Sequence, residues 1–515
     1  MEYESIPKEK FEFEDGTHRV SDETLKIKPR GYLKDAFMRF KKNKSSVFAA
    51  YIIGFLCVFA IFSPILSPYT VKDTDSVYQN YPPFIERVAE MKIGVFDGGT
   101  IRTGQSELQI SALSAIGEET GYSPIIDVLE KNSYTEIYRG KERTSYSYKV
   151  KVNKYYERGV VYKIFSYSEY EAIKKWQNET GIRVLYPYVE QKDVYPTETT
   201  YPQRNANIWY LCENSRNRPV LDENGELIPV YSKNKNKEYG TYDSLRIEGD
   251  DGSYIYGVEK SGSVECRVCY YDYYRYLNGH TPTYIFGTDV YGRDLFSAVG
   301  MGARFSLVFA LVVSAINLTI GAIYGAVQGF YGGSVDLVLG RIADILSGVP
   351  YIVVVTLFTL HLSARVGVVP SFLFAFVLTG WIGTAALTRK QFYRFKGREY
   401  VLASKTLGAS DKRLMYKHIL PNAIGTIITS SVLVIPGVIS SETALTYLGI
   451  INLSDFAGTS IGELMALGQQ SMTSSAHAML FPALFVSLLL ISFNLFGNGL
   501  RDAFDPSTRG VDVNG

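Results

Sequence analysis

Six stretches of the chain are long and apolar enough to cross a membrane as helices. The first, 46–66, has about 21 residues and no charge, and a helix needs about 20 such residues to cross the hydrocarbon core of a bilayer. The other five follow a long polar segment and lie at 305–330, 342–362, 367–388, 423–441 and 479–500. One such run could be a buried core helix, but six predict an all-α polytopic membrane protein with six transmembrane helices.

The positive charges predict how these helices are oriented. Lys and Arg gather before the first apolar run, at 26–44, and between the fourth and fifth, at 389–417, whereas 451–478 has neither. Because cationic loops stay on the cytoplasmic side, we expect both termini and the 389–421 loop in the cytoplasm. The first run starts past residue 45 and is long enough to span, so we expect an uncleaved helix and no signal peptide.

The overall composition averages two unlike parts. A mean hydropathy of −0.01 and a net charge of +1 suit a large soluble protein and give no reason to expect a nucleic-acid partner. The segregated pattern instead predicts a multi-pass protein of the cell membrane. Its expected parts are a cytoplasmic tail (1–45), a first transmembrane helix (46–67), an extracytoplasmic insert (68–284), a five-helix core (285–509) and a second cytoplasmic tail (510–515).

The insert, 68–284, holds most of the 40 tyrosines. Alternation of aromatic or β-branched with polar residues, as at 146–152, is typical of strands with one buried face. Turn signals such as Asn278-Gly279 separate the segments. We therefore predict a mostly β inserted domain, in which Tyr side chains could serve ordinary strand packing or a binding surface.

Three of the four cysteines lie in the insert, at Cys212, Cys266 and Cys269. Cys266 and Cys269 have the spacing of half a zinc ribbon, but no second CxxC and no suitably spaced His pair accompanies them. We therefore expect no metal site and favour a disulfide, with Cys266 and Cys269 as candidates. Unpaired thiols are the alternative.

The 389–421 loop carries the strongest functional pattern. Helix formers dominate 399–407, Gly408 can end that helix with a positive φ, and Ser410 or Asp411 can cap the next one. Small residues let such a helix approach another protein's backbone closely, and they are Ala403, Ser404, Gly408 and Ala409. The pattern predicts a docking helix.

This loop resembles that of the permease subunits of ABC importers, whose pattern is Glu-Ala-Ala, three residues, Gly, nine residues, Ile-x-Leu-Pro. With Gly408 aligned, Ala403-Ser404 matches the Ala pair and Leu420-Pro421 the ending. Leu402 replaces the Glu and His418 the Ile. The Glu399-Tyr-Val segment and the His-Ile-Leu-Pro ending resemble the variant common in the peptide-transport branch.

Further motifs resemble the C-type subunit of oligopeptide and dipeptide permeases. They lie at 287–294, 302–307, 329–336, 341–344, 442–449 and 493–506. The resemblance covers 40–68 and 285–509. Two positions depart from the usual pattern: Asn498 replaces an Asp, and Ile461 replaces the Trp that commonly precedes Gly462.

The resemblance implies the type I ABC importer permease fold and the import of oligopeptides or dipeptides by alternating access. Implied partners are a homologous second permease subunit, two cytoplasmic ATPase subunits and an extracytoplasmic peptide-binding protein, in a membrane of lipid. The sequence has no GxxxxGK[ST] phosphate loop. We therefore expect no enzymatic activity and no cofactor in this chain, with ATP and Mg²⁺ bound by the partners. The implied coupling residues are Glu399, Ala403, Ser404, Gly408 and Ala409.

Charged residues near the helix ends are further candidates. Glu442 follows a long apolar run, so it should face protein or water; it either lines the substrate path near the outer gate or bonds a partner helix. Arg341 and Asp344, at i and i+3, are expected to form a structural pair. Asp289, Arg293 and Asp294 are expected to order their loop.

Two other functions compete with peptide import. A membrane-anchored surface receptor or adhesin would use the Tyr-rich insert as its working part, but it would need neither five further helices nor a docking loop. A secondary transporter would show repeated helices and a charged midplane site, and the sequence shows neither. Within the import hypothesis, the insert could dock the binding protein, cap the pore or contact the second permease.

Overall fold

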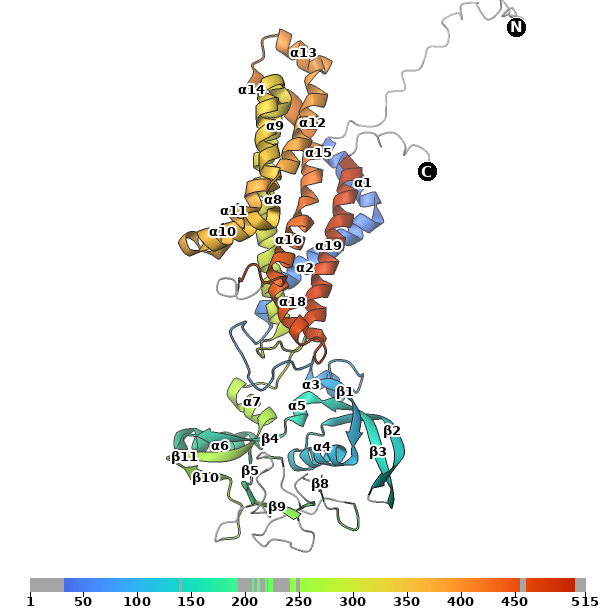
Figure 1. Ribbon diagram of the computed structural model, residues 1–515, viewed down its shortest axis with the longest axis vertical. Helices are drawn as coiled ribbons and strands as arrows, with labels where there is room; N and C mark the ends of the chain where they lie inside the picture. Colours follow the sequence, from blue (N-terminus) through green and yellow to red (C-terminus); the bar gives the residue numbers. More distant parts are fainter. Residues whose placement is uncertain are drawn as a thin grey trace, which may run out of the picture.

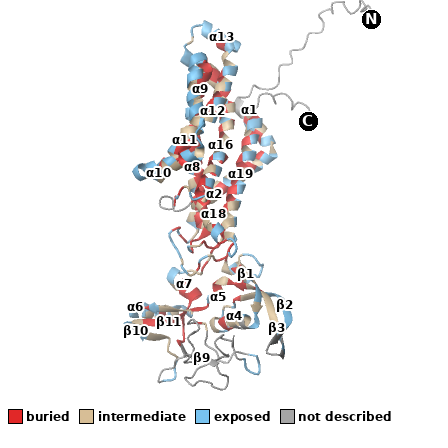
Figure 2. Cartoon of the chain, in the orientation of Figure 1, coloured by how far each residue is buried: buried red, intermediate tan, exposed pale blue. Residues whose placement is uncertain are grey.

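The computed structural model describes residues 32–138, 141–192, 206–207, 211–213, 218–219, 221–225, 241–246, 251–453 and 460–504. Figure 1 shows a bundle of long helices and, at one end of it, a separate outer domain. The outer domain is built from the chain between α2 (Lys44–Leu66) and α8 (Leu295–Tyr331). The bundle and the outer domain each have their own buried core (Figure 2).

Among the described residues, five helical segments are long and apolar enough to cross a membrane. They are α2, α8, the α11–α12 segment Val368–Lys396, the segment Asp411–Tyr447, and α19 (His477–Phe504). Each contains or overlaps one of the predicted runs. The segment Val368–Lys396 consists of α11 (Val368–Gly380) and α12 (Ile382–Lys396), and the segment Asp411–Tyr447 contains α14 (Asp411–Arg413), α15 (Leu420–Val432) and α16 (Val434–Tyr447). The other helices of the bundle are α1 (Tyr32–Lys42), α9 (Gly333–Ser347), α10 (Tyr351–Val366), α13 (Glu399–Thr406) and α18 (Ile461–Gln470).

The third predicted run, 342–362, is divided between two helices rather than forming one continuous helix. It straddles the break between α9 and α10, which are bent by 75° relative to each other and count as a sixth span only if taken together. Pro350 stands at this break as the residue before α10. A proline disfavours helical backbone in the residue before it. Counting consecutive apolar residues across the break does not detect this bend.

The fifth predicted run, 423–441, also differs, because the helical backbone begins at Asp411 and continues to Tyr447. Pro421 sits in the first turn of α15 and is preceded by a π-helical turn, Leu414–Ile419. Proline has no N–H to donate, and its ring clashes with the carbonyl four residues back. The wider turn lets the helical backbone continue past the proline.

Three glycines bring α8 and α12 into backbone contact. A Cβ atom added to Gly321, Gly325 or Gly329 would lie 2.7, 2.1 and 2.7 Å from the carbonyl oxygens of Trp381, Ala385 and Arg389, respectively. The spacing of four residues keeps the three glycines on one face of α8. Small residues at this spacing are the common device for close helix packing in membranes.

The outer domain is mixed, so the prediction of a mostly β domain is only partly right. Its helices are α3 (Glu86–Glu90), α4 (Glu107–Thr120), α5 (Lys154–Glu157), α6 (Tyr167–Thr180) and α7 (Tyr270–Asn278). Its strands are β1 (Gly99–Ser106), β2 (Ile125–Tyr138), β3 (Lys141–Asn153), β4 (Val160–Phe165), β5 (Leu185–Tyr186), β6 (Val189–Lys192), β7 (Leu211–Glu213), β8 (Arg218–Pro219), β9 (Thr241–Arg246), β10 (Gly257–Lys260) and β11 (Ser263–Cys269). Helices α4 and α6 begin with capping boxes, Ser106 with Gln109 and Ser166 with Glu169.

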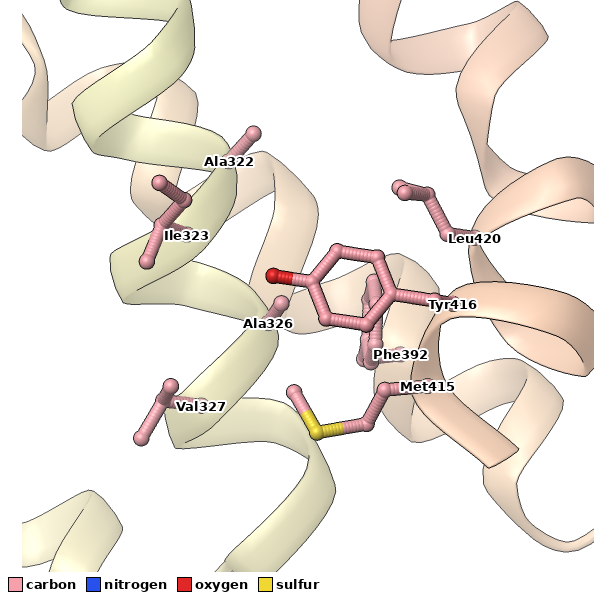
Figure 3. A pocket seen from close by; sticks show the side chains of 8 residues that line it. All are labelled: Ala322, Ile323, Ala326, Val327, Phe392, Met415, Tyr416 and Leu420. Carbon is pink, nitrogen blue, oxygen red and sulfur yellow. The ribbon is translucent and has the colours of Figure 1, made fainter. Parts of the chain in front are cut away.

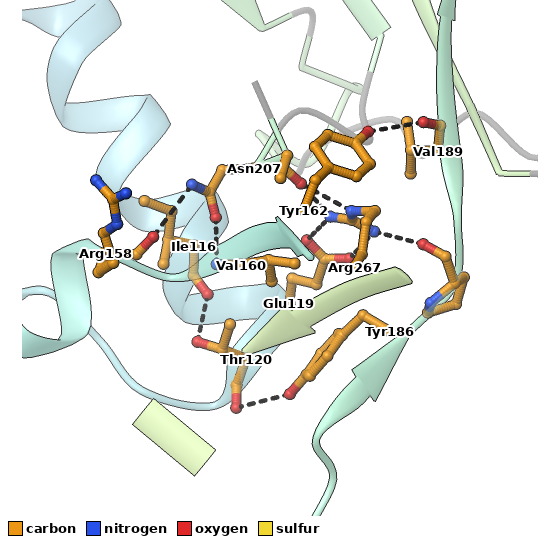
Figure 4. A network of polar contacts seen from close by, with 12 residues as sticks. Ile116, Glu119, Thr120, Arg158, Val160, Tyr162, Tyr186, Val189, Asn207 and Arg267 are labelled. Carbon is orange, nitrogen blue, oxygen red and sulfur yellow. Dashed lines mark hydrogen bonds and ion pairs between the residues drawn. The ribbon is translucent and has the colours of Figure 1, made fainter. Parts of the chain in front are cut away.

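The strands form three small antiparallel sheets, with orders β1-β3-β2, β10-β11-β4 and β6-β9-β7-β8; β5 also pairs with β11. A buried ion pair joins α4 to β11 (Figure 4). The Arg267 guanidinium makes two hydrogen bonds to the Glu119 carboxylate, at 2.9 and 2.7 Å, and others to the carbonyls of Pro187 and Ala206. Both side chains are at most 3% exposed.

Cys266 and Cys269 are free thiols, so the disulfide considered between them is not formed. Both lie on β11, three residues apart, where a rise of about 3.3 Å per residue separates their Cα atoms by about 10 Å. A disulfide needs Cα atoms within about 7 Å. The side chain of Cys212 lies outside the described residues.

An aromatic neck joins the outer domain to the bundle. We define it by Tyr69, Tyr78, Tyr81, Phe84 and Tyr284, which flank the first two spans in sequence and are all at most 7% exposed. Its ring contacts include a stacked Tyr69–Tyr284 pair with centroids 4.6 Å apart. The neck belongs to the core of the outer domain, so that core begins where the membrane helices end.

Candidate functional sites: the 397–420 loop, Glu442 and the outer loop at 287–294

The 397–420 loop lies at the end of the bundle farthest from the outer domain (Figure 1). Helix α13 ends as predicted, with Gly408 at φ +81°. The N–H groups of Gly408 and Ala409 donate to the carbonyls of Lys405 and Ser404, at 3.0 and 3.1 Å. This is the Schellman arrangement that satisfies the last carbonyls of a helix.

One side chain anchors α13 to the bundle, and most of the other residues of the helix are exposed. Val401 is 2% exposed and packs in a cluster with Phe392, Leu414 and Ile419. Leu402 is 51% exposed and Leu407, just after the helix, is 89% exposed. The predicted docking residues Glu399, Ala403 and Gly408 are also exposed, whereas Ser404 and Ala409 are partly buried.

An apolar pocket of about 70 Å³ lies near this anchor, between α8, α12 and the helical segments that follow α13 (Figure 3). It is lined by Ala322, Ile323, Ala326, Val327, Phe392, Met415, Tyr416 and Leu420. Interiors are normally packed without such gaps. The π-helical turn that holds Met415 and Tyr416 is thus less tightly packed against α8 than a closed interface would be.

Glu442 is completely buried in α16. The Ser306 hydroxyl of α8 donates to its Oε2 at 2.7 Å, while its Oε1 has no hydrogen-bond partner among the described residues. Close packing surrounds it: a Cβ atom on Gly462 of α18 would lie 2.3 Å from the Thr443 carbonyl oxygen. Glu442 therefore links α16 to α8 through this hydrogen bond.

Asp289, Arg293 and Asp294 come together at the end of the bundle that is next to the outer domain. Asp289 accepts from the side-chain Nε of Arg293 at 2.7 Å and from two backbone N–H groups of the same loop. Asp294 caps α8 and accepts from the Ser67 hydroxyl at the end of α2, at 2.7 Å. Burial raises the pKa of Asp294 to about 6. These contacts hold the loop in place, as the sequence suggests.

Arg341 and Asp344 lie apart from these groups. Their side chains approach to 3.8 Å and are more than 70% exposed, so the pair contributes little to stability in this chain. A stronger ion pair was not predicted from the sequence. Arg389 of α12 binds both carboxylate oxygens of Asp336 of α9, and the Tyr393 hydroxyl donates to Asp336 at 2.8 Å. Residues 53 positions apart give no local signal for such a pair.

Two family models match the chain. The binding-protein-dependent transport system inner membrane component covers 317–510, and the N-terminal TM domain of oligopeptide transport permease C covers 31–83. Residues 84–316, which include most of the outer domain, lie in neither match.

Curated relatives match over similar lengths. The oligopeptide transport system permease protein OppC of Bacillus subtilis is 40% identical over 224 residues, which are 44% of this chain and 72% of the relative. The dipeptide transport system permease protein DppC of the same organism is 40% identical over 226 residues, covering 44% and 69%. DppC of Lactococcus lactis is 37% identical over 278 residues, covering 54% and 78%.

The chain therefore belongs to the family of binding-protein-dependent transport system inner membrane components, and it is a multi-pass membrane permease. Among solved structures, the MetNI methionine ABC transporter in an inward-facing conformation matches with a TM-score of 0.34 and 14% identity, over 40% of this chain and 96% of that one. A TM-score this low does not bear on the fold.

Proposed function

We propose that this chain is a transmembrane subunit of an ABC importer that takes oligopeptides or dipeptides into the cell. The proposal draws on the relatives, which are oligopeptide and dipeptide permeases. The observation that carries it is α13, a short helix held by Val401 at one end of the bundle and otherwise open. A receptor or adhesin would have no use for such a helix.

In this proposal α13 docks on an ATPase subunit in the cytoplasm, with Glu399, Ala403, Ser404, Gly408 and Ala409 at or near the contact. Two such ATPases bind ATP and Mg²⁺, and a homologous permease subunit completes the membrane part. Both termini are then cytoplasmic, and the outer domain is extracytoplasmic, where a peptide-binding protein delivers the substrate.

The structure suggests how motion at α13 would reach the helices. Val401 contacts a cluster formed by side chains of α8, α12 and the π-helical turn, so a displaced α13 pushes on three elements at once. The pocket behind Met415 and Tyr416 gives these side chains room to shift. ATP binding would thereby open the path outward, and hydrolysis would reset it. Glu442 would hold α8 and α16 together during this cycle.

The docking role can be tested with one added charge. Ala403→Glu places a carboxylate on the open face of α13 and should abolish peptide uptake and co-purification of the ATPase subunits. Ser45→Glu is the matched control, because Ser45 is also exposed, at the start of α2, where an acidic residue suits the helix dipole. Both variants should reach the membrane in normal amounts. Normal uptake by Ala403→Glu would refute the docking role.

A further inference from the structure

An exposed apolar loop lies on the outer domain between α3 and β1. Its five consecutive residues 91–95 are all exposed, and Met91, Ile93 and Val95 are 66%, 63% and 54% exposed. Ile101 of β1 is 60% exposed. Single exposed apolar residues are common on protein surfaces, but a group of them indicates a contact surface.

The loop has a fixed shape. Lys92, Gly94 and Phe96 have φ angles of +53°, +87° and +55°, and a left-handed conformation is costly for residues other than glycine. The Lys151 ammonium donates to the Gly94 carbonyl at 3.0 Å and pairs with Asp97. The surrounding structure thus holds the apolar side chains outward in a conformation that the sequence alone would not prefer.

The loop starts and ends at the aromatic neck. Phe84 forms antiparallel bridges both to Asp97, at the end of the loop, and to Tyr284, which precedes α8. Figure 1 shows α3 and the adjoining part of β1 at the end of the outer domain nearest the helix bundle. Membrane helices end at the same neck: Ile65 and Leu66, the last residues of α2, are 67% and 72% exposed. The loop therefore belongs to the part of the outer domain that is nearest to the ends of these helices.

We propose that residues 91–95 insert into the outer surface of the lipid bilayer and give the outer domain a second attachment to the membrane. Apolar side chains flanked by cations suit the boundary between headgroups and acyl chains. Met91, Ile93 and Val95 would supply the apolar contact. The exposed cations Arg87 and Lys92 would face the lipid phosphates, and the exposed Glu90 carboxylate next to Met91 offsets one of these charges. The inference goes beyond peptide import, since it requires only that the chain spans a membrane.

A nitroxide label tests the contact in the full chain. The variant Ile93→Cys is labelled, together with its co-purifying subunits, in nanodiscs of phosphatidylcholine and phosphatidylglycerol. The collision rates of the label with oxygen, which enters lipid, and with a water-soluble nickel chelate are then compared. Ile164→Cys is the matched control, because Ile164 is also 60% exposed but lies on β4, farther from the bundle in Figure 1. Labelled wild-type protein gives the contribution of the native cysteines.

We expect the ratio of oxygen to nickel collisions to be clearly higher at position 93 than at position 164, because apolar side chains at the membrane interface enter the boundary between headgroups and acyl chains. Equal ratios at the two positions would place the loop in water and overturn the proposal. A label at position 93 shielded from both reagents would indicate contact with another protein subunit, which would overturn it too.

Discussion

At the scale of single residues, the outer domain depends on charges buried where water cannot reach them. Arg267 uses its guanidinium donors on the Glu119 carboxylate and on two backbone carbonyls. Such a network fixes the relative positions of α4, β11 and the segments around Pro187 and Ala206. It also makes each partner costly to remove, because the other charge stays buried.

Glu119→Gln should therefore lower the free energy of unfolding of the outer domain by about 3–5 kcal/mol. Glu130→Gln is the control: its ion pair with Lys149 is 36–52% exposed and should matter by less than about 1 kcal/mol. Denaturant unfolding of the purified full chain, followed by the fluorescence of the outer domain, measures both. Equal losses in the two variants would contradict a special role for the buried pair.

Asp272 should give the outer domain a pH-dependent stability. It is 3% exposed and accepts from the Tyr122 hydroxyl at 2.9 Å, and burial raises its pKa to about 6. The unfolded chain has a pKa near 3.9 for Asp, so the folded state holds the proton more tightly. Stability is then lost as the pH rises from about 4 to about 6, by roughly 2–3 kcal/mol.

Asp272→Asn keeps the shape of the protonated acid and cannot ionise. The wild type and this variant should be similarly stable near pH 4, and the variant should be the more stable above pH 6. Thermal unfolding across this range measures the difference. A difference that does not change between pH 4 and 7 would show that Asp272 does not titrate as described.

At the scale of elements, the packing of α8 on α12 rests on three glycines. Gly325→Leu would drive a side chain into the Ala385 carbonyl, 2.1 Å from the added Cβ. Overpacking typically costs about 1–3 kcal/mol, and rigid backbone on the other side leaves little room for relief. We expect less protein in the membrane and a lower melting temperature in detergent.

Gly383→Leu is the control for this variant, because it lies on α12 and its Cβ would meet nothing within 4 Å. It should leave membrane abundance unchanged. If both variants accumulate normally, the close contact between α8 and α12 does not limit folding.

Gly408 differs from these glycines, because its backbone conformation, and not a close neighbouring atom, requires a glycine. Nothing lies within 4 Å of an added Cβ, but φ is +81°. Gly408→Val would cost about 1–2 kcal/mol through backbone conformation and should displace the end of α13, reducing peptide uptake strongly. Gly408→Asn, which tolerates this conformation better, should retain more uptake. Equal uptake by the two variants would rule out a conformational role for Gly408.

How far the sequence predicts these elements depends on whether the signal is local. Apolar runs locate the spans because about 20 consecutive residues must face lipid, and Gly408 marks the end of α13 in the same way. The capping boxes at Ser106 and Ser166 were also local signals, and they show that α4 and α6 could have been anticipated. The Arg389–Asp336 pair and the Ser306–Glu442 hydrogen bond depend on tertiary contact and could not.

At the scale of the whole molecule, several contacts at the aromatic neck connect the outer domain to the bundle. Tyr81 N–H donates to the Thr288 hydroxyl at 2.8 Å, and the Ser475 hydroxyl donates to the Asn80 carbonyl at 3.0 Å. A Cβ on Gly292 would lie 2.0 Å from the Asp75 carbonyl oxygen. Motion of the ends of α8 and α19 that adjoin the outer domain should therefore be transmitted to that domain. Motion of the outer domain should likewise displace these helix ends.

The same contacts show where the outer domain can be removed. Phe84 and Tyr284 exchange two backbone hydrogen bonds, at 2.8 and 2.9 Å. The two points of the chain that a short turn would have to join therefore already lie side by side. Replacing residues 85–283 with Asn-Gly, a two-residue hairpin turn, keeps the contacts that residues 75–81 and 287–294 make. We expect this shortened chain to insert into the membrane and to retain its ATPase partners, but to bind the peptide-binding protein more weakly than the full chain.

Deleting 75–280 also removes the contacts made by residues 75–81. It should therefore reduce the amount of folded protein as well, which size-exclusion chromatography measures. Unchanged affinity for the binding protein in the 85–283 replacement would exclude the outer domain as its docking site.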